Sequence, residues 1–149
     1  MEYYALRPEV AGDFGDHAVL DTRVHPPVVQ HLHFEFADWF GDDLVCTFPV
    51  YLVSQRLAGK LASSGLRAFV LQEAEITLSP EAEEILEGQE LPTFLWWQVT
   101  GQAGVDDFGL TDKAVLVVSE RGLDVLRDGG RLEICEIMPY DEQKVPNAD

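Results

Sequence analysis

The chain has 149 residues, an apolar fraction of 46% and a formal net charge of −17. That length suits one domain, and the apolar fraction is too high for a disordered chain. An acidic excess of this size repels nucleic acid and anionic membranes, and it favours encounters with basic proteins or with cations. No apolar run approaches the roughly 18 residues of a membrane span and no signal peptide is visible, so we expect a cytoplasmic protein.

The first strands are expected at Tyr3–Leu6 and Val28–Phe36. In the second strand, alternate side chains divide between two faces, one apolar and one carrying His31, His33 and Glu35. Imidazole and carboxylate groups spaced about 7 Å apart are metal-ligand types, so this face is a candidate metal site. The solvent-facing side of a half-buried strand has the same pattern and requires no cofactor, and we expect none.

Two segments resemble each other, at about 42–78 and about 106–138. Each contains a pair of aspartates, a β-rich run with a Val-Ser-x-Arg motif, a glycine and a second β-rich run. Ser54 and Ser119 are suitable N-caps for a short helix, because a serine hydroxyl accepts a hydrogen bond from a first-turn N–H. Gly65 and Gly130 can end those helices in the left-handed conformation. We therefore expect a repeated strand–helix–strand unit.

Arg56 and Arg121 occupy the same position of the repeat, in the first helical turn. The helix dipole disfavours a cation there, which indicates a neighbouring counter-charge. We expect structural ion pairs, Arg56 with Asp43 and Arg121 with Asp107. A site for a phosphorylated ligand is the alternative, but neither arginine is accompanied by a glycine-rich phosphate loop.

The segment 68–112 carries ten acidic residues and no Lys, Arg or His. Within it, Ser79-Pro80 predicts the start of a short helix to about Leu86, followed by a strand from Thr93 to Thr100 and a loop from Gly101 to Thr111. The charge pattern favours this segment as the contact surface for a basic partner. The acids expected to form that surface are Glu81, Glu83, Glu84, Glu87 and Glu90.

Trp96 and Trp97 are adjacent in the expected strand, so their side chains point to opposite faces. Burial of both indoles is one outcome. In the other, one indole is half exposed beside the acidic surface, and Trp97 then serves as a contact residue for the partner.

Motifs for covalent catalysis are not visible. There is no Gly-x-Ser-x-Gly sequence, and Cys46 and Cys135 have neither a Cys-x-x-Cys motif nor the spacing of metal ligands. Each cysteine lies among apolar residues, so we expect buried free thiols rather than a disulfide.

A set of short motifs extends from about residue 20 to about residue 138. It includes Val24-His-Pro-Pro-Val-Val29, Trp39-Phe-Gly-Asp-Asp-Leu44, Val53-Ser-Gln-Arg56, Asp106-Asp-Phe-Gly109 and Leu116-Val-Val-Ser-Glu-Arg121. In these motifs the chain resembles a bacterial family first catalogued as a domain of unknown function and now classed as immunity proteins of polymorphic toxin systems, of the kind described from myxobacteria. The resemblance implies a small cytoplasmic antitoxin that blocks a cognate toxin without catalysing a reaction, and it supplies no residue-level site.

We therefore expect a single α+β domain over residues 1–149, with a mixed or mainly antiparallel sheet, two short helices from the repeated unit and a polar tail at 139–149. The leading hypothesis is an immunity protein whose acidic surface binds and neutralises a toxin with a basic surface. One alternative is a non-catalytic adaptor for a basic protein. Another is a metal-dependent enzyme that uses His31, His33 and Glu35. The sequence leaves the oligomeric state open.

Overall fold

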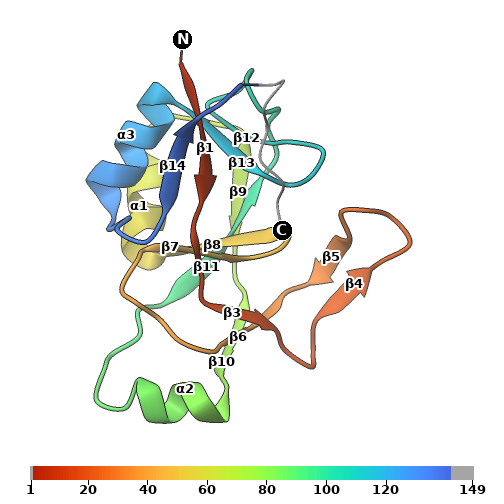
Figure 1. Cartoon of the computed structure of the whole chain (residues 1–149), viewed down its shortest axis with the longest axis vertical. Coiled ribbons are helices and arrows are strands. Elements are labelled where there is room, and N and C mark those ends of the chain that lie inside the picture. Colours follow the sequence, from red (N-terminus) through yellow and green to blue (C-terminus); the bar gives the residue numbers. More distant parts are fainter. Residues whose placement is uncertain (1, 142–149) are drawn as a thin grey trace.

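Both expected strand–helix–strand units are present in the computed structural model, which describes residues 2–141 (Figure 1). The first unit contains β7 (Leu44–Thr47), β8 (Val50–Ser54), α1 (Gln55–Ser63) and β9 (Phe69–Gln72). The second contains β12 (Phe108–Leu110), β13 (Leu116–Ser119), α3 (Glu120–Gly129) and β14 (Glu136–Pro139). In each unit an antiparallel strand pair leads into a helix, and a third strand follows. Residues 142–149 of the expected tail lie outside the described residues.

Each unit builds its sheet around a strand that precedes the other unit in the chain. β11 (Phe94–Val99) lies between β8 and β9, and β1 (Tyr3–Arg7) lies between β13 and β14. All four pairings are antiparallel, and their registers correspond, because Phe94 lies opposite Ser54 and Tyr3 lies opposite Ser119. The two halves of the chain are therefore interlocked by exchanged strands. A short parallel strand, β2 (Glu9–Val10), extends the first sheet beyond β7.

The helices begin at the serines that the sequence predicts. The Ser54 hydroxyl accepts a hydrogen bond from the Leu57 N–H at 3.2 Å, and the Ser119 hydroxyl accepts one from the Gly122 N–H at 3.1 Å. These contacts pair backbone donors that a helix start would otherwise leave free. The same chemistry starts α2 (Pro80–Ile85), which is capped by Ser79.

The predicted ends of α1 and α3 are partly wrong. At Gly65 the prediction is confirmed, because this residue directly follows the C-cap Ser64 and has the expected positive φ of 80°. Gly130 is the C-cap of α3 and is extended, with a φ of −160°. An added Cβ at Gly130 would lie 2.7 Å from the Asp43 Cβ. Close packing against the first unit, rather than left-handed backbone, therefore favours glycine at this position.

Further strands fill the end of the molecule away from α1 and α3 (Figure 1). β3 (Gly12–Phe14), β6 (His33–Phe36) and β10 (Glu75–Leu78) form a three-stranded sheet, and α2 lies beyond it. β4 (Val19–Asp21) and β5 (Val28–His31) form a separate hairpin that projects to one side. Across all the sheets most pairings are antiparallel, and β2–β7 and β6–β10 are parallel. The α+β class with a mainly antiparallel arrangement is confirmed.

Three predicted segments are divided differently in the structure. The expected strand Val28–Phe36 is interrupted at Leu32, because β5 pairs with β4 whereas β6 pairs with β3 and β10. The β-rich run 68–78 is likewise two strands, β9 and β10, in different sheets. The segment 101–111, expected as a loop, contains β12, which forms the outer strand of the second unit.

The central strands β8 and β11 are covered on both faces. Tyr51, Val53 and Trp97 belong to the core cluster that includes the buried faces of α1 and α3. Leu52 and Trp96 belong to a second cluster, together with the phenylalanines of the three-stranded sheet. Burial on both faces explains why these strands read as nearly continuous apolar runs. Within residues 2–141, no helix is both long and apolar enough to cross a membrane.

Candidate functional site

The Val-Ser-x-Arg motifs form equivalent structural clamps. Asp43 accepts hydrogen bonds from the Ser54 hydroxyl at 2.5 Å and from the Arg56 guanidinium at 2.6 Å. Asp107 accepts from the Ser119 hydroxyl at 2.5 Å and from two nitrogens of Arg121 at 2.8 Å. Both ion pairs predicted from the sequence are present. Each one joins the start of a helix to the residue that precedes the first strand of its unit.

The pKa values of both aspartates lie below their ordinary range. For Asp43, burial alone would raise the pKa, but hydrogen bonds from Ser54, from the Arg131 N–H and from Arg56 outweigh it. For Asp107, the hydrogen bonds from Arg121 are the largest cause of the lowered pKa. These carboxylates stay ionised and occupied by donors, so the clamps are part of the scaffold and not a phosphate site.

Asp42 has a role that its sequence pattern does not reveal. Its carboxylate is fully buried and accepts hydrogen bonds from the backbone N–H groups of Glu133, Ile134 and Cys135 at 2.8–3.2 Å. The Arg131 N–H donates to Asp43 at 2.7 Å. The aspartate pair of the first unit therefore fixes the loop that leads into β14 of the second unit, a contact between residues about ninety positions apart.

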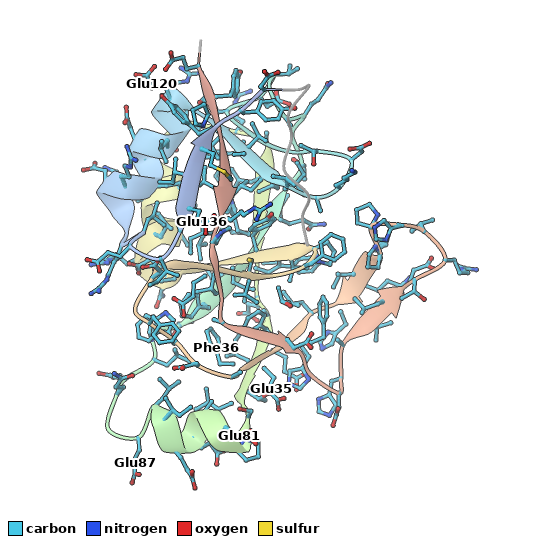
Figure 2. The ribbon with its side chains drawn as sticks, viewed as in Figure 1. Glu35, Phe36, Glu81, Glu87, Glu120 and Glu136 are labelled. Atoms are coloured by element: carbon cyan, nitrogen blue, oxygen red, sulfur yellow. The ribbon has the colours of Figure 1, made fainter. Side chains whose placement is uncertain are left out.

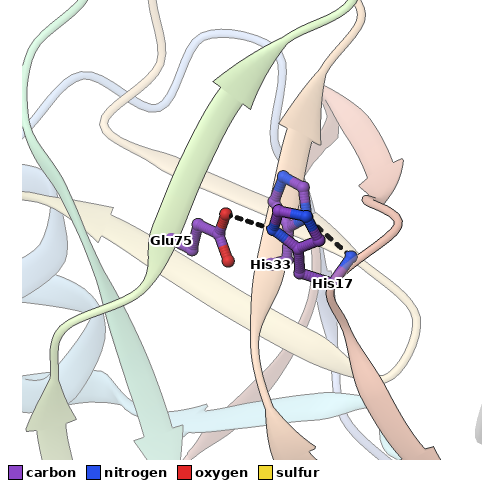
Figure 3. A group of neighbouring side chains, drawn as sticks. All are labelled: His17, His33 and Glu75. Carbon is purple, nitrogen blue, oxygen red and sulfur yellow. Dashed lines mark hydrogen bonds and ion pairs between the residues drawn. The ribbon is translucent and has the colours of Figure 1, made fainter.

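A histidine–glutamate cluster lies beside the three-stranded sheet (Figure 3). The Glu75 carboxylate forms hydrogen bonds with two imidazoles. Its Oε2 lies 2.7 Å from His17 Nδ1, and its Oε1 lies 3.1 Å from His31 Nε2. The His33 ring lies against the His17 ring, with 5.0 Å between the ring centroids. Three of the four histidines of the chain thus gather around one carboxylate. Hydrogen bonding to Glu75 raises the pKa of His17 and lowers that of Glu75.

His33 is the buried member of this cluster, and both of its nitrogens are engaged. Nδ1 accepts a hydrogen bond from the backbone N–H of His17 at 3.0 Å. In a neutral ring Nε2 therefore carries the proton, and it donates to the Thr77 hydroxyl at 2.7 Å. Gly15 makes this position possible, because an added Cβ there would lie 2.2 Å from the His33 ring. His33 therefore holds the turn that carries His17.

The predicted metal face of His31, His33 and Glu35 is not assembled as a unit. Glu35 shares a face with His33 along β6, but the carboxylate beside the histidines is Glu75 of the neighbouring strand. The reason is geometric: residues opposite each other on paired strands are about 4.8 Å apart, whereas i and i+2 on one strand are about 7 Å apart. His17 and Glu75 were missed because only strand pairing, which no local motif encodes, brings them to this place.

The predicted acidic surface is exposed on α2 and the turn after it (Figure 2). Five glutamates are exposed there, and none forms an ion pair within residues 2–141: Glu81, Glu83, Glu84, Glu87 and Glu90. Ile85 lies among them and is 55% exposed, whereas Ala82 and Leu86 face the protein. We call Pro80–Glu90 the α2 surface. It combines unpaired negative charge with one exposed aliphatic side chain.

The assignment of Trp97 to this surface is wrong. Its side chain is 1% exposed and packs against Phe69 and Phe108, with T-shaped ring contacts at 6.2 and 5.1 Å between centroids. Trp96 points the other way, as the strand alternation requires, and it is also buried, so the expected burial of both indoles is confirmed. The prediction of a half-exposed indole assumed that one face of the strand was open, but both faces are covered.

Two hollows flank the tip of the β7–β8 hairpin, one mainly apolar and one of mixed polarity. One, of about 430 Å³, is lined by Val10, Phe48 and Tyr51 among others, and another, of about 300 Å³, is bordered by the β4–β5 hairpin.

Cys46 lines the larger hollow, and Cys135 is buried nearby in the core. Both are free thiols, and burial raises the pKa of each to about 12. Because the thiolate is the reactive form, neither cysteine is activated as a nucleophile.

Comparison of the chain with protein-family models, with curated proteins and with solved structures returned no match.

Proposed function

We propose that this chain is an immunity protein, a cytoplasmic antitoxin that binds a cognate bacterial toxin and neutralises it by direct occlusion. The observation that carries the proposal is the α2 surface, where five exposed glutamates without ion pairs in the described residues accompany the exposed Ile85. Its position at one end of the molecule leaves it open to a partner (Figures 1 and 2). The family resemblance described above supports the same function.

The physical basis is electrostatic steering toward a basic surface. Opposite charges accelerate encounter by orders of magnitude at low salt, and the effect falls as salt screens the field. Ile85 supplies exposed apolar area beside these charges, which a partner can desolvate on contact. An inhibitor needs tight and fast association more than it needs any reactive group, and an exposed charged surface with an apolar contact residue suits that role.

The first test is co-expression of the chain with the product of the adjacent gene. Immunity predicts a complex that co-purifies and growth that is restored in proportion to the amount of this protein. If the neighbour is expressed and toxic but neither complex nor rescue is found, the proposal fails. A complex without rescue would instead identify a non-catalytic adaptor for a basic protein.

A second test locates the interface. The double substitution Glu84→Lys and Glu87→Lys should slow association by at least about tenfold at low salt and weaken its salt dependence. These positions lie at the end of α2, where cations do not oppose the helix dipole, so the fold should be retained. The matched control is Asp112→Lys with Asp124→Lys, which changes two exposed acids away from α2 and gives the same net charge. Equal effects of the two pairs would show that only total charge matters.

A further inference from the structure

We infer that His17, His31 and Glu75 form a binding site for a divalent transition-metal ion of the Zn²⁺ class. This site is separate from the α2 surface and does not depend on the proposed immunity function. Its ligand set is two imidazoles and one carboxylate, contributed by the turn after β3, by β5 and by β10.

The geometry around Glu75 suits one shared ion. His17 Nδ1 lies beside Oε2 and His31 Nε2 beside Oε1, at 2.7 and 3.1 Å. Ligands of one tetrahedral zinc ion, at about 2.1 Å from the metal, lie about 3.4 Å from each other. The two nitrogens contact different oxygens of Glu75, so the side chains must turn toward one oxygen to place both imidazoles and that oxygen around a single ion. The His17 and His31 side chains are 70% and 53% exposed, so they can turn without moving the backbone.

His33 is excluded as a ligand although one of its ring nitrogens lies within 4.8 Å of a ligand atom of His17 and of Glu75. One of its nitrogens accepts from the His17 N–H and the other donates to Thr77, so neither offers a free lone pair. Its contribution is to fix the backbone of His17 opposite Glu75. This hydrogen bond reaches the backbone of His17 and leaves its ring free to turn.

The chemistry also selects the ion. Imidazole nitrogen favours zinc, nickel, cobalt and copper, whereas Mg²⁺ and Ca²⁺ prefer an all-oxygen shell. The remaining positions on the ion would be open to water or to a donor from a partner. General attraction of cations to an acidic chain lacks this selectivity, and the experiment is designed to separate the two.

The test uses the full chain, freed of any histidine tag and dialysed against a chelator. Zn²⁺ binding is measured by calorimetry, and Co²⁺ binding by its visible absorption, both in a large excess of Mg²⁺ that occupies unselective acidic sites. We expect one ion per chain, with affinity falling as the pH drops through the imidazole range because protons compete for the nitrogens.

Variants identify the ligands. His17→Asn, His31→Asn and Glu75→Gln should each weaken binding at least about tenfold. The matched control is His25→Asn, because His25 is the remaining histidine and its ring lies against Phe48, outside the cluster. The pair Glu84→Lys and Glu87→Lys should leave Zn²⁺ affinity unchanged, which keeps this result distinct from the toxin-binding test. Absence of saturable Zn²⁺ binding above the Mg²⁺ background, or equal losses for His17→Asn and His25→Asn, would overturn the inference.

Discussion

Removal of the Asp43 side chain should cost far more stability than removal of its ion-pair partner Arg56. The Asp43 carboxylate is nearly buried and accepts hydrogen bonds from the Ser54 hydroxyl, from the Arg56 guanidinium and from the Arg131 N–H, at 2.5–2.7 Å. Arg56, by contrast, has a side chain that is 70% exposed. Loss of Asp43 therefore leaves hydrogen-bond donors without an acceptor, whereas loss of Arg56 removes only an exposed cation.

The magnitudes follow from burial. Arg56→Ala removes an exposed cation, and exposed ion pairs contribute up to about 1 kcal/mol. Asp43→Ala also leaves the buried Ser54 hydroxyl and the Arg131 N–H without their acceptor, and breaking a buried charged network costs about 3–5 kcal/mol. It further loosens the loop before β14, so the cost falls on both units. The structure therefore predicts at least a threefold difference between the two free-energy changes.

Urea denaturation followed by tryptophan fluorescence measures both values, with an unchanged m-value required for the comparison. The double variant Asp43→Ala with Arg56→Ala should lose only a few tenths of a kcal/mol of stability relative to Asp43→Ala alone. The reason is that the arginine has already lost its partner in the single variant. If Arg56→Ala is as destabilising as Asp43→Ala, the clamp acts through the ion pair itself, and the reasoning from buried hydrogen bonds is wrong.

Three further predictions concern other parts of the chain. Burial raises the pKa of Glu9, and one of its carboxylate oxygens has no partner among the described residues. Because the ionised Glu9 carboxylate is disfavoured in the folded protein, Glu9 lowers stability at neutral pH, where it must ionise, and not at acid pH, where it is protonated. Glu9→Gln should therefore stabilise the protein at neutral pH by up to about 1 kcal/mol, with no gain near pH 4. Lower stability of the variant in urea titrations at neutral pH would contradict this. Gly15→Ala should lower the melting temperature by several degrees, because the new methyl group overlaps the His33 ring, whereas Gly59→Ala, which meets open space, should not. Fragments 1–90 and 91–149 should be unfolded alone and gain near-ultraviolet circular dichroism on mixing, because the first lacks β11 and the second lacks β1. A fragment that folds independently would refute the conclusion that the two units depend on exchanged strands.

The features predicted correctly from the sequence are those decided by local chemistry. A serine hydroxyl reaches a backbone N–H three residues later, so Ser54, Ser79 and Ser119 mark their helices without any knowledge of the fold. The Arg56 and Arg121 ion pairs were predictable for a related reason. A cation in a first helical turn is unfavourable unless an acid lies close by, and the repeat indicated which acid.

The features that were missed depend on contacts between distant segments. Alternation correctly placed Trp96 and Trp97 on opposite faces, but only the packing of a second sheet reveals that both faces are covered. The carboxylate beside the histidines was sought as Glu35 on the strand of His33, whereas strand pairing places Glu75 opposite His33, and its carboxylate contacts His17 and His31. Asp42 looks like a surface acid in the sequence, and only the return of the chain beside it provides the three N–H groups that allow its burial.

The arrangement of the repeat explains why both proposed sites lie at the same end of the molecule. The exchanged strands, the two helices and the aspartate clamps account for the scaffold, and their counterparts occur in both units. Within residues 2–141, the sheet of β3, β6 and β10, the β4–β5 hairpin and α2 have no counterpart in the second unit. These additions contain His17, His31, Glu75 and every glutamate of the α2 surface. Substitutions that alter either site should therefore leave the interlocked scaffold folded, which is the condition that makes both proposals testable in the intact protein.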